Sequence, residues 1–333
     1  MSESQVGDGI HLARLGRVIP ILPQPGNQTL AGNLYNPSIL ALDEDRFLIS
    51  FRISNYLRFN GIPGRRLSFP GRFGGGWLQV HLANGAPAVK SAIGFCEFNS
   101  RDETFSAPFQ VDEDFSERYS GQVHDTYGDE DIRLFRSHGE IRSSGTFIGA
   151  DQLGRMVEAS IQVSGSSVKY RARPIRHPRE DQFQKNWMPI EGDGNRFITD
   201  HEPFCICTVA DGQVIEERVG NGLSHAHGLR GSTQMIAWDG GYLGLVHNNN
   251  QSAKFSSNYK LEYKHYLLFA NHDFSEVKIS SEFVFFGLAV EYCTGIALVG
   301  SEFFLTFQVA DSASYLLRLD ESVVRRLQGS AKS

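Results

Sequence analysis

Short apolar runs, each broken by a turn of Asp, Gly, Glu or Asn, recur along the chain, and helical periodicity is almost absent. Clear examples are "SILALDEDRFLISFRIS" (38–54), "QMIAWDGGYLGLVH" (234–247) and "GIALVGSEFFLTFQV" (295–309). Such a run predicts a strand, a tight turn and a second, antiparallel strand. We therefore expect an all-β fold, with a short helical segment only in the C-terminal "ESVVRRLQGSAKS".

The hairpins form a loose repeat, because a short polar marker precedes each one. The markers are "NPSI" at 36, "EDIRLF" at 130, "KNWMPI" at 185, "LRGSTQMI" at 229 and "EYCTGIAL" at 291. Five such units predict a five-bladed β-propeller, as one domain over residues 1–333 with a core of about 30–320. A two-sheet sandwich also has strands at this spacing, but five marked units in 333 residues favour the propeller.

The longest interval between markers contains "RFNGIPGRRLSFPGRFGGGW" (58–77), which is rich in Gly and Arg. It shows no clear alternation, so we interpret it as a long loop. Two hypotheses for this loop are that it caps the site or that it joins a neighbouring subunit. The sequence leaves a homo-oligomer open.

Bulk composition excludes several classes of partner. The net charge of −6 gives no general attraction to nucleic acid or to anionic membranes. The polar start "MSESQVGDG" is not a signal peptide, and no apolar run reaches a membrane-spanning length, so we expect a soluble, cytoplasmic protein. The four cysteines fit no zinc pattern, and His225 and His227 lack a third ligand, so no metal or other cofactor is expected.

The marker "EDIRLF" carries the densest set of charges. On a regular strand Asp131 and Arg133 share one face, while Glu130 lies on the other. In a propeller, residues that head the inner strands meet at one mouth, so this marker predicts a contribution to a shared site. The adjacent arginine would lower the pKa of Asp131, unless it pairs elsewhere. The structural alternative is an Asp–Arg pair that only stabilises a strand end.

Other markers supply further candidates. Arg52 lies on the polar side of an alternating strand, where its guanidinium could bind a sugar hydroxyl or phosphate. Lys185 shortly precedes Trp187, and a lysine close to an aromatic residue suits a sugar-phosphate site. Arg230 lies in a Gly-rich turn that suits an anion. Several candidates have a plainer structural alternative. Arg52 could be a solvated surface arginine, Asn36 and Asp311 could be turn residues, and His247 could be a hydrogen-bonded histidine at a strand end.

Taken in order, "NPSI", Arg52, "YGDEDIRLF", "KNW-P", "RGST", "GLVH" and Asp311 resemble the motifs of the five-bladed propellers of glycoside hydrolase family 130. These are inverting β-mannoside phosphorylases and hydrolases, with related β-mannosyltransferases. The resemblance covers roughly residues 30–320. The chain departs from the family's Glu-Asp-Pro-Arg motif, because Ile132 stands where the family has proline.

The resemblance implies a role for each matched residue. Asp131 would be the general acid, which the family is thought to use through a sugar hydroxyl. Phosphate would be held by Lys185, Arg230 and His247. Sugar would be held by Asn36, Ser38, Arg52, Glu130, Arg133 and Asp311. The two further arginines of the family's phosphorylases are not placed; candidates are Arg171, Arg173 and Arg176.

The expected function is cleavage or formation of β-mannosidic or similar bonds with inversion, most like a glycoside phosphorylase. The partner would be an oligosaccharide or sugar phosphate, with inorganic phosphate as co-substrate. The alternatives are a transferase with a mannosyl donor, an inverting hydrolase, and a non-catalytic carbohydrate-binding propeller. Five-bladed glycosidases that place an aspartate in the first marker are disfavoured, because this chain has Asn36 there.

Overall fold

The computed structural model describes most of the chain. The described ranges are 10–24, 33–54, 56–58, 65–69, 76–82, 91–114, 129–148, 154–178, 184–192, 194–220, 228–249, 263–288, 290–311 and 313–331. Almost all regular structure in these ranges is β, as expected. The exceptions are the short 3-10 helix η1 (Leu12–Arg14) and the helix α1 (Glu321–Gln328).

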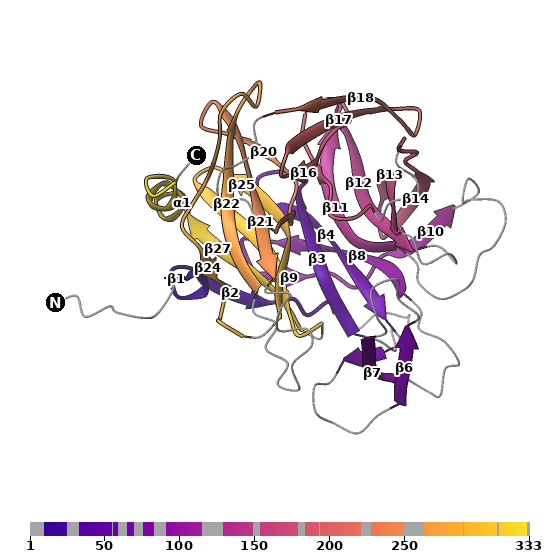
Figure 1. Ribbon diagram of the computed structural model, residues 1–333. Coiled ribbons are helices and arrows are strands. Elements are labelled where there is room, and N and C mark those ends of the chain that lie inside the picture. Colours follow the sequence, from indigo (N-terminus) through magenta and orange to yellow (C-terminus); the bar gives the residue numbers. More distant parts are fainter. Residues whose placement is uncertain are drawn as a thin grey trace, which may run out of the picture.

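Five of the sheets follow one another along the chain, and most of their strands are antiparallel neighbours in sequence (Figure 1). The first contains β3 (Asn33–Ala41), β4 (Arg46–Ser54), β8 (Ser91–Asn99) and β9 (Thr104–Phe105). The second contains β11 (Asp129–Ser137), β12 (Glu140–Ile148), β13 (Gly154–Ser164), β14 (Ser167–Pro174) and, parallel to β14, β10 (Gln110–Asp114).

The third sheet contains β15 (Met188–Pro189), β16 (Arg196–His201), β17 (Phe204–Ala210) and β18 (Gln213–Val219). The fourth contains β19 (Leu229–Gly231), β20 (Ile236–Trp238), β21 (Gly241–Asn249), β22 (Tyr263–Asn271), β23 (Val277–Ile279), β24 (Phe283–Val284) and β1 (Ile10–His11). The fifth contains β25 (Glu291–Val299), β26 (Glu302–Val309), β27 (Ala313–Asp320) and β2 (Arg17–Pro20).

Among the described residues the hydrophobic core forms five clusters, and each cluster lies between two sheets. Leu48 and Leu134 belong to the cluster between the first and second sheets, and Phe135 and Phe197 to the next. Two further clusters join the third sheet to the fourth and the fourth to the fifth. The last cluster joins the fifth sheet back to the first. In it the ring centroids of Phe47 and Phe304 are 4.4 Å apart. The packing therefore forms a cyclic series.

The first strands of the sheets also contact one another in turn. Strand β3 contacts β11 and β25, β11 contacts β15, and β20 contacts β25. The end of β15 and the segment before β20 are joined by backbone hydrogen bonds, such as that from the Met235 amide to the Pro189 carbonyl at 2.8 Å. The start of each sheet thus faces the centre of the series.

Segments from the first and last parts of the described chain pair in the fifth sheet. Strand β2 pairs with β27, so a segment near the N-terminus completes a sheet whose other three strands lie within residues 291–320. Helix α1 follows directly, and the Asp320 carboxylate caps it by accepting from the Ser322 amide. Its apolar face is buried because Val323, Val324 and Leu327 pack against the cluster between the fourth and fifth sheets.

The predicted hairpins are confirmed as β3–β4, β20–β21 and β25–β26, and the predicted C-terminal helical segment is confirmed as α1. The loop interpretation of residues 58–77 is wrong in part. A three-stranded sheet of β5 (Tyr56–Arg58), β7 (Gly76–Leu82) and β6 (Arg65–Phe69) occupies some of it, and the remainder lies outside the described residues. The alternation in "RRLSF" is short, and flanking glycines and prolines obscure it.

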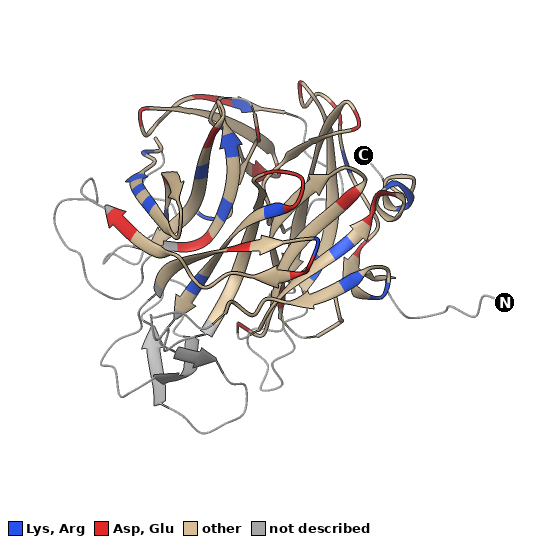
Figure 2. Ribbon diagram, turned by 180° about the vertical axis from the view of Figure 1, so that it is seen from behind, with Lys and Arg blue, Asp and Glu red and all other residues tan. Residues whose placement is uncertain are grey.

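Charged residues of both signs are mixed over the described strands, as Figure 2 shows. Many form ion pairs between neighbouring strands, such as Arg318 with Glu302 and Arg173 with Glu158 at 2.7 Å. Among the described residues no helix has the length and apolar character that would span a membrane.

Candidate active site

In three of the sheets, the innermost strand is interrupted by a bulge. The pairing register shifts between Tyr35 and Ser38 in β3, between Glu130 and Arg133 in β11, and between Cys293 and Gly295 in β25. A bulge leaves residues out of the ladder and re-aims their side chains. The markers recognised in the sequence are thus places where the strand stops being regular.

Asn36 and Asp131 occupy equivalent places in two of these bulges. Both have a left-handed backbone, with φ of 49° and 53°, a conformation that Asn and Asp tolerate better than most residues. The Asn36 amide donates to the Asp131 carboxylate at 2.5 Å. A third left-handed residue, Asn186 (φ 65°), precedes β15. The local sequence therefore turns three polar side chains toward the centre of the series.

Asp131 belongs to a cluster of four charged side chains from three sheets. The Lys185 ammonium lies 2.9 Å from Asp131 Oδ2 and 3.4 Å from Glu130 Oε2. The Arg52 guanidinium donates to Glu130 Oε1 at 2.6 Å and lies over the Tyr35 ring. Two cations and two carboxylates thus neutralise one another. Arg52 is buried, so its plainer alternative, a solvated surface arginine, is wrong.

The environment of Asp131 acts on its pKa in two directions. Burial raises the pKa, whereas the charges of Lys185, Arg52 and Arg133 lower it, and the net shift is below the ordinary value. Burial lowers the pKa of Lys185, but the charges of Asp131 and Glu130 raise it, and the net shift is upward. The structure therefore holds Asp131 as a carboxylate and Lys185 as an ammonium at neutral pH.

Glu130 and Asp131 both reach Lys185, which corrects the expectation that they lie on opposite faces. The expectation assumed a regular strand, but the bulge at Asp131 breaks the alternation. Arg133 is likewise used differently from a simple Asp–Arg pair. It is fully buried, and it donates to the backbone carbonyl of Asp131 at 2.6 Å rather than to the carboxylate.

Arg133 joins four sheets at the centre of the series. Its guanidinium also donates to the Ser232 carbonyl at 2.6 Å, to the Tyr292 hydroxyl at 2.6 Å, and to Asn186 Oδ1 at 3.4 Å. These partners come from the fourth, fifth and third sheets. Because every contact is internal, Arg133 positions the bulge of Asp131 and presents no exposed group to a sugar.

His247 and Arg230 lie beside this centre on paired strands. They are opposite one another in the β19–β21 register. His247 shares a hydrogen bond with the Ser232 hydroxyl at 2.8 Å and stacks on Tyr263 at 5.4 Å. Burial, with His265 and Arg230 nearby, lowers the pKa of His247 well below its usual range, so the imidazole is neutral.

Other predicted residues are used elsewhere. Ser38 is fully buried, and its hydroxyl accepts from the Leu134 amide at 3.0 Å, so it joins two strands. Asp311 lies in the β26–β27 turn and is held by Gln308. Arg171 pairs with Asp112 on the outer part of the second sheet, and Arg173 pairs with Glu158 as described above.

Arg176 forms an isolated bridge with Gln213. His225 and His227 lie outside the described residues.

Sequence reasoning missed the residues that surround Arg133. Asn186, Ser232 and Tyr292 were all inside the recognised markers, but no role was assigned to them. Their position inside the markers was the one sequence signal that could have indicated a role at the site. Their roles depend on contacts between different sheets, such as the hydrogen bond from Tyr292 to Asn186 at 3.2 Å.

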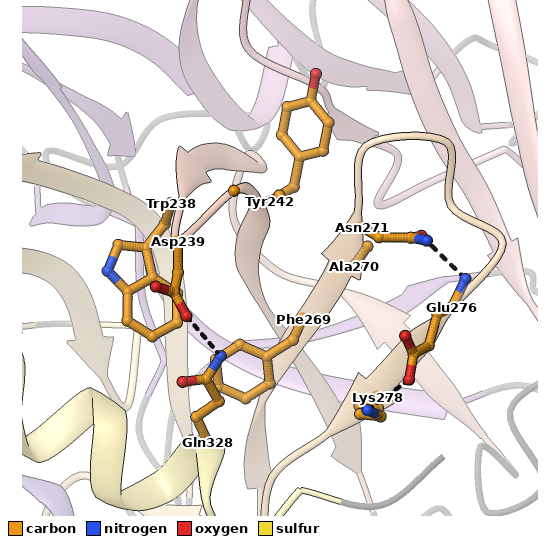
Figure 3. Close-up of a pocket in the computed structure, with 11 residues that line it drawn as sticks. Trp238, Asp239, Tyr242, Phe269, Ala270, Asn271, Glu276, Lys278 and Gln328 are labelled. Carbon is orange, nitrogen blue, oxygen red and sulfur yellow. Dashed lines mark hydrogen bonds and ion pairs between the residues drawn. The ribbon is translucent and has the colours of Figure 1, made fainter.

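A separate pocket of about 210 Å³ lies away from this cluster, between the β20–β23 part of the fourth sheet and α1 (Figure 3). Its polar groups are mutually satisfied, as Asp239 accepts from Gln328 at 3.2 Å and Glu276 pairs with Lys278. Within the described ranges, no group of three His, Cys, Asp or Glu side chains is arranged for a metal ion.

No family model matches the chain, and no curated protein is significantly similar to it in sequence. Solved structures are similar over nearly its whole length. The β-1,2-mannobiose phosphorylase from Listeria innocua is 13% identical, with a TM-score of 0.58 over 94% of this chain and 97% of that one. A structure reported with the glycoside hydrolases of the GH130 family of mannoside phosphorylases is 12% identical, with a TM-score of 0.60 over 97% and 96%.

The chain has the fold of the GH130 enzymes. A glycosyl hydrolase from Bacteroides ovatus, 12% identical, gives a TM-score of 0.57 over 87% of this chain and 85% of that one. These likenesses establish a common fold. Assignment of the reaction depends on the chain's own site.

Proposed function

We propose that the chain is a carbohydrate-active enzyme that cleaves or forms β-mannosidic bonds with inversion, as a glycoside phosphorylase with Asp131 as general acid. The observation that carries the proposal is the buried cluster of Asp131, Asn36, Lys185, Glu130 and Arg52, assembled from three sheets where first strands bulge. Burial of charged groups is energetically unfavourable because it removes them from water, so clusters of this kind are typical of functional sites. The fold shared with GH130 enzymes supports the substrate class.

The proposed architecture is a five-bladed β-propeller, one domain over residues 1–333 with a core of about 30–320. Five sheets, the cyclic order of the five core clusters and the contacts among first strands support it. In this arrangement the bulged strand heads form the mouth. Pairing of β2 with β27 closes the last blade with a segment from the start of the chain.

In the proposed reaction Asp131 supplies the proton to the leaving group, through a sugar hydroxyl as the family resemblance implies. Asn36 orients its carboxylate, and Arg52 and Glu130 contact sugar hydroxyls beside it. Lys185, Arg230 and neutral His247 hold phosphate, which attacks the anomeric carbon. Arg230 pairs with His247 through the β-ladder, but its side chain makes no hydrogen bond or ion pair with the described residues, so its guanidinium suits an oxyanion. Asp311 remains a proposed sugar contact at the edge.

Phosphorolysis is favoured over hydrolysis by the placement of the second carboxylate. An inverting hydrolase separates its two carboxyl groups by roughly 6.5–9.5 Å, to leave room for water. Glu130 and Asp131 instead bind the same ammonium, at 3.4 and 2.9 Å. Their facing oxygens are therefore too close together for Glu130 to serve as the base that activates a water.

The test is a turnover assay on β-1,2-mannobiose and other β-mannosides, with and without inorganic phosphate. We expect phosphate-dependent formation of a sugar 1-phosphate. Asp131→Asn should lower turnover about 10²–10⁴-fold, the usual contribution of a general acid. Asp112→Asn, which changes a carboxylate in an exposed pair with Arg171, should leave turnover unchanged.

Release without phosphate would contradict phosphorolysis and indicate hydrolysis. Sugar binding without turnover would instead indicate a transferase with another donor, or a carbohydrate-binding propeller.

A further inference from the structure

Lys185 differs from the other members of the charged cluster in its exposure. Its side chain is 30% exposed, whereas those of Asp131 and Glu130 are 5% and 10% exposed. Glu130 has a second cation, Arg52, at 2.6 Å. Asp131 has no other ion pair among the described residues, and its remaining side-chain partner is the neutral amide of Asn36. Removal of Lys185 would therefore affect Asp131 far more than Glu130.

The segment that carries Lys185 packs directly against the strand that carries Arg230. A Cβ built on Gly231 would lie only 2.2 Å from the carbonyl oxygen of Asn186, so the two backbones touch and a side chain there is excluded. Lys185 and Arg230 each stand next to one of the touching residues. His247 is opposite Arg230 in the β-sheet register. Tyr292 links the two sides, because its ring meets that of His247 at 4.9 Å between centroids and Tyr292 also interacts electrostatically with Lys185.

We propose that Lys185 has two positions: in one it neutralises Asp131 and Glu130, as in the structure, and in the other it binds an oxyanion held by Arg230 and His247. The inference rests on the proposed function and adds its regulation. When the anion draws the ammonium away, the Asp131 carboxylate takes up a proton from the solvent. One O–H bond forms on the carboxylate, and one bond to hydrogen breaks in the hydronium ion or buffer acid that donates the proton.

The surroundings of Asp131 explain why the proton follows. The groups that face it are Lys185 before β15, Arg52 on β4, Glu130 and Arg133 on β11, Tyr292 on β25 and Asn36 on β3. Arg52 is committed to Glu130, and Arg133 to backbone carbonyls and Tyr292. Burial raises the pKa of Asp131, and Lys185 opposes it more than Arg52 or Arg133 does, so removal of Lys185 shifts the balance toward the neutral acid.

The consequence is an acid that is loaded only when its anionic co-substrate is bound. A carboxylate cannot protonate a leaving group, so a β-mannoside that arrives alone meets an inactive Asp131. Binding of phosphate would supply the nucleophile and the protonated acid together. This coupling would suppress hydrolysis of the sugar by water.

The test is isothermal titration calorimetry with sulfate at pH 7, in buffers of different ionisation enthalpy. Sulfate resembles phosphate but does not titrate near neutrality, so any proton uptake belongs to the protein. We expect the wild type to take up a large fraction of one proton per sulfate bound. Asp131→Asn should bind sulfate with that uptake lost, and His247→Gln should retain it.

Lys185→Met should bind sulfate more weakly and without uptake, whereas Lys278→Met, which removes a surface lysine paired with Glu276, should behave as wild type. Infrared difference spectra of the wild-type protein provide a readout that needs no variant, because sulfate should produce the band of a protonated carboxyl group.

Sulfate binding without proton uptake, or with uptake unchanged in Asp131→Asn, would overturn the inference and leave the phosphorylase proposal standing. Failure of both sulfate and phosphate to bind would overturn the inference and the phosphorylase proposal together.

Discussion

At the scale of single residues, the site depends on side chains placed where a regular strand could not put them. Asn36 and Asp131 meet because both backbones are left-handed within bulges. Arg133 supports that arrangement from behind, since its guanidinium binds the Asp131 carbonyl and partners on three other sheets. The backbone and the carboxylate of Asp131 are therefore both held in one orientation.

The Arg52–Glu130 pair predicts a clear difference between buried and exposed arginines. Arg52→Met leaves the buried Glu130 carboxylate with only the more distant Lys185, so the free energy of unfolding should fall by about 3 kcal/mol. Urea denaturation at pH 7 measures it. Arg46→Met is the matched control, because Arg46 pairs with the exposed Asp43 and should change stability little. Equal losses in the two variants would contradict a buried pair.

At the scale of elements, residues at the start of the inner strands form the candidate site, whereas residues inside the strands pack in the hydrophobic core. In β22 this division places a histidine in an apolar setting. His265 stacks on Phe283 at 5.9 Å and meets Phe285 edge-on at 5.0 Å, and neither ring nitrogen has a hydrogen-bond partner among the described residues. Burial lowers the pKa of His265 to about 3. The folded protein therefore holds this imidazole neutral well into the acid range.

This histidine predicts a stability that falls with acid. An unfolded histidine, with a pKa near 6.5, binds a proton below that pH, whereas folded His265 does not until about pH 3. The free energy of unfolding should therefore decrease by up to about 1.4 kcal/mol per pH unit from this group between those limits. His265→Leu should flatten the dependence by about one proton, as measured by urea denaturation at pH 7, 5 and 4.

His272→Leu, at an exposed position, is the control and should keep the wild-type slope. The account of His265 would be wrong if its variant kept that slope as well.

At the scale of the whole molecule, the hairpins and their number were predictable because alternation and turn residues are local signals. The same markers located the strand heads that supply Asn36, Asp131 and Lys185. The bulges were not predictable, because they depend on pairing with the next strand, and a regular strand was the natural assumption for "EDIRLF". Nor was the pairing of β2 with β27, which joins residues about three hundred positions apart.

The arginines show the same limit from another side. Composition cannot tell that Arg171 and Arg173 lie on an outer strand, in pairs with Asp112 and Glu158, while Arg133 is fully buried at the centre. Cyclic packing of five sheets decides which arginine faces which partner. Only the assembled molecule therefore identifies Arg133 as a support for the Asp131 backbone.

The most direct test of the central claim is the stereochemistry and identity of the product. The wild-type protein would be incubated with β-1,2-mannobiose and inorganic phosphate, and the reaction followed by phosphorus and proton NMR. One acid at Asp131 and a direct attack by phosphate predict the α-anomer of the sugar 1-phosphate as the first product, because a single displacement inverts the β-bond. First appearance of the β-anomer, or of free sugar with phosphate unchanged, would contradict the account.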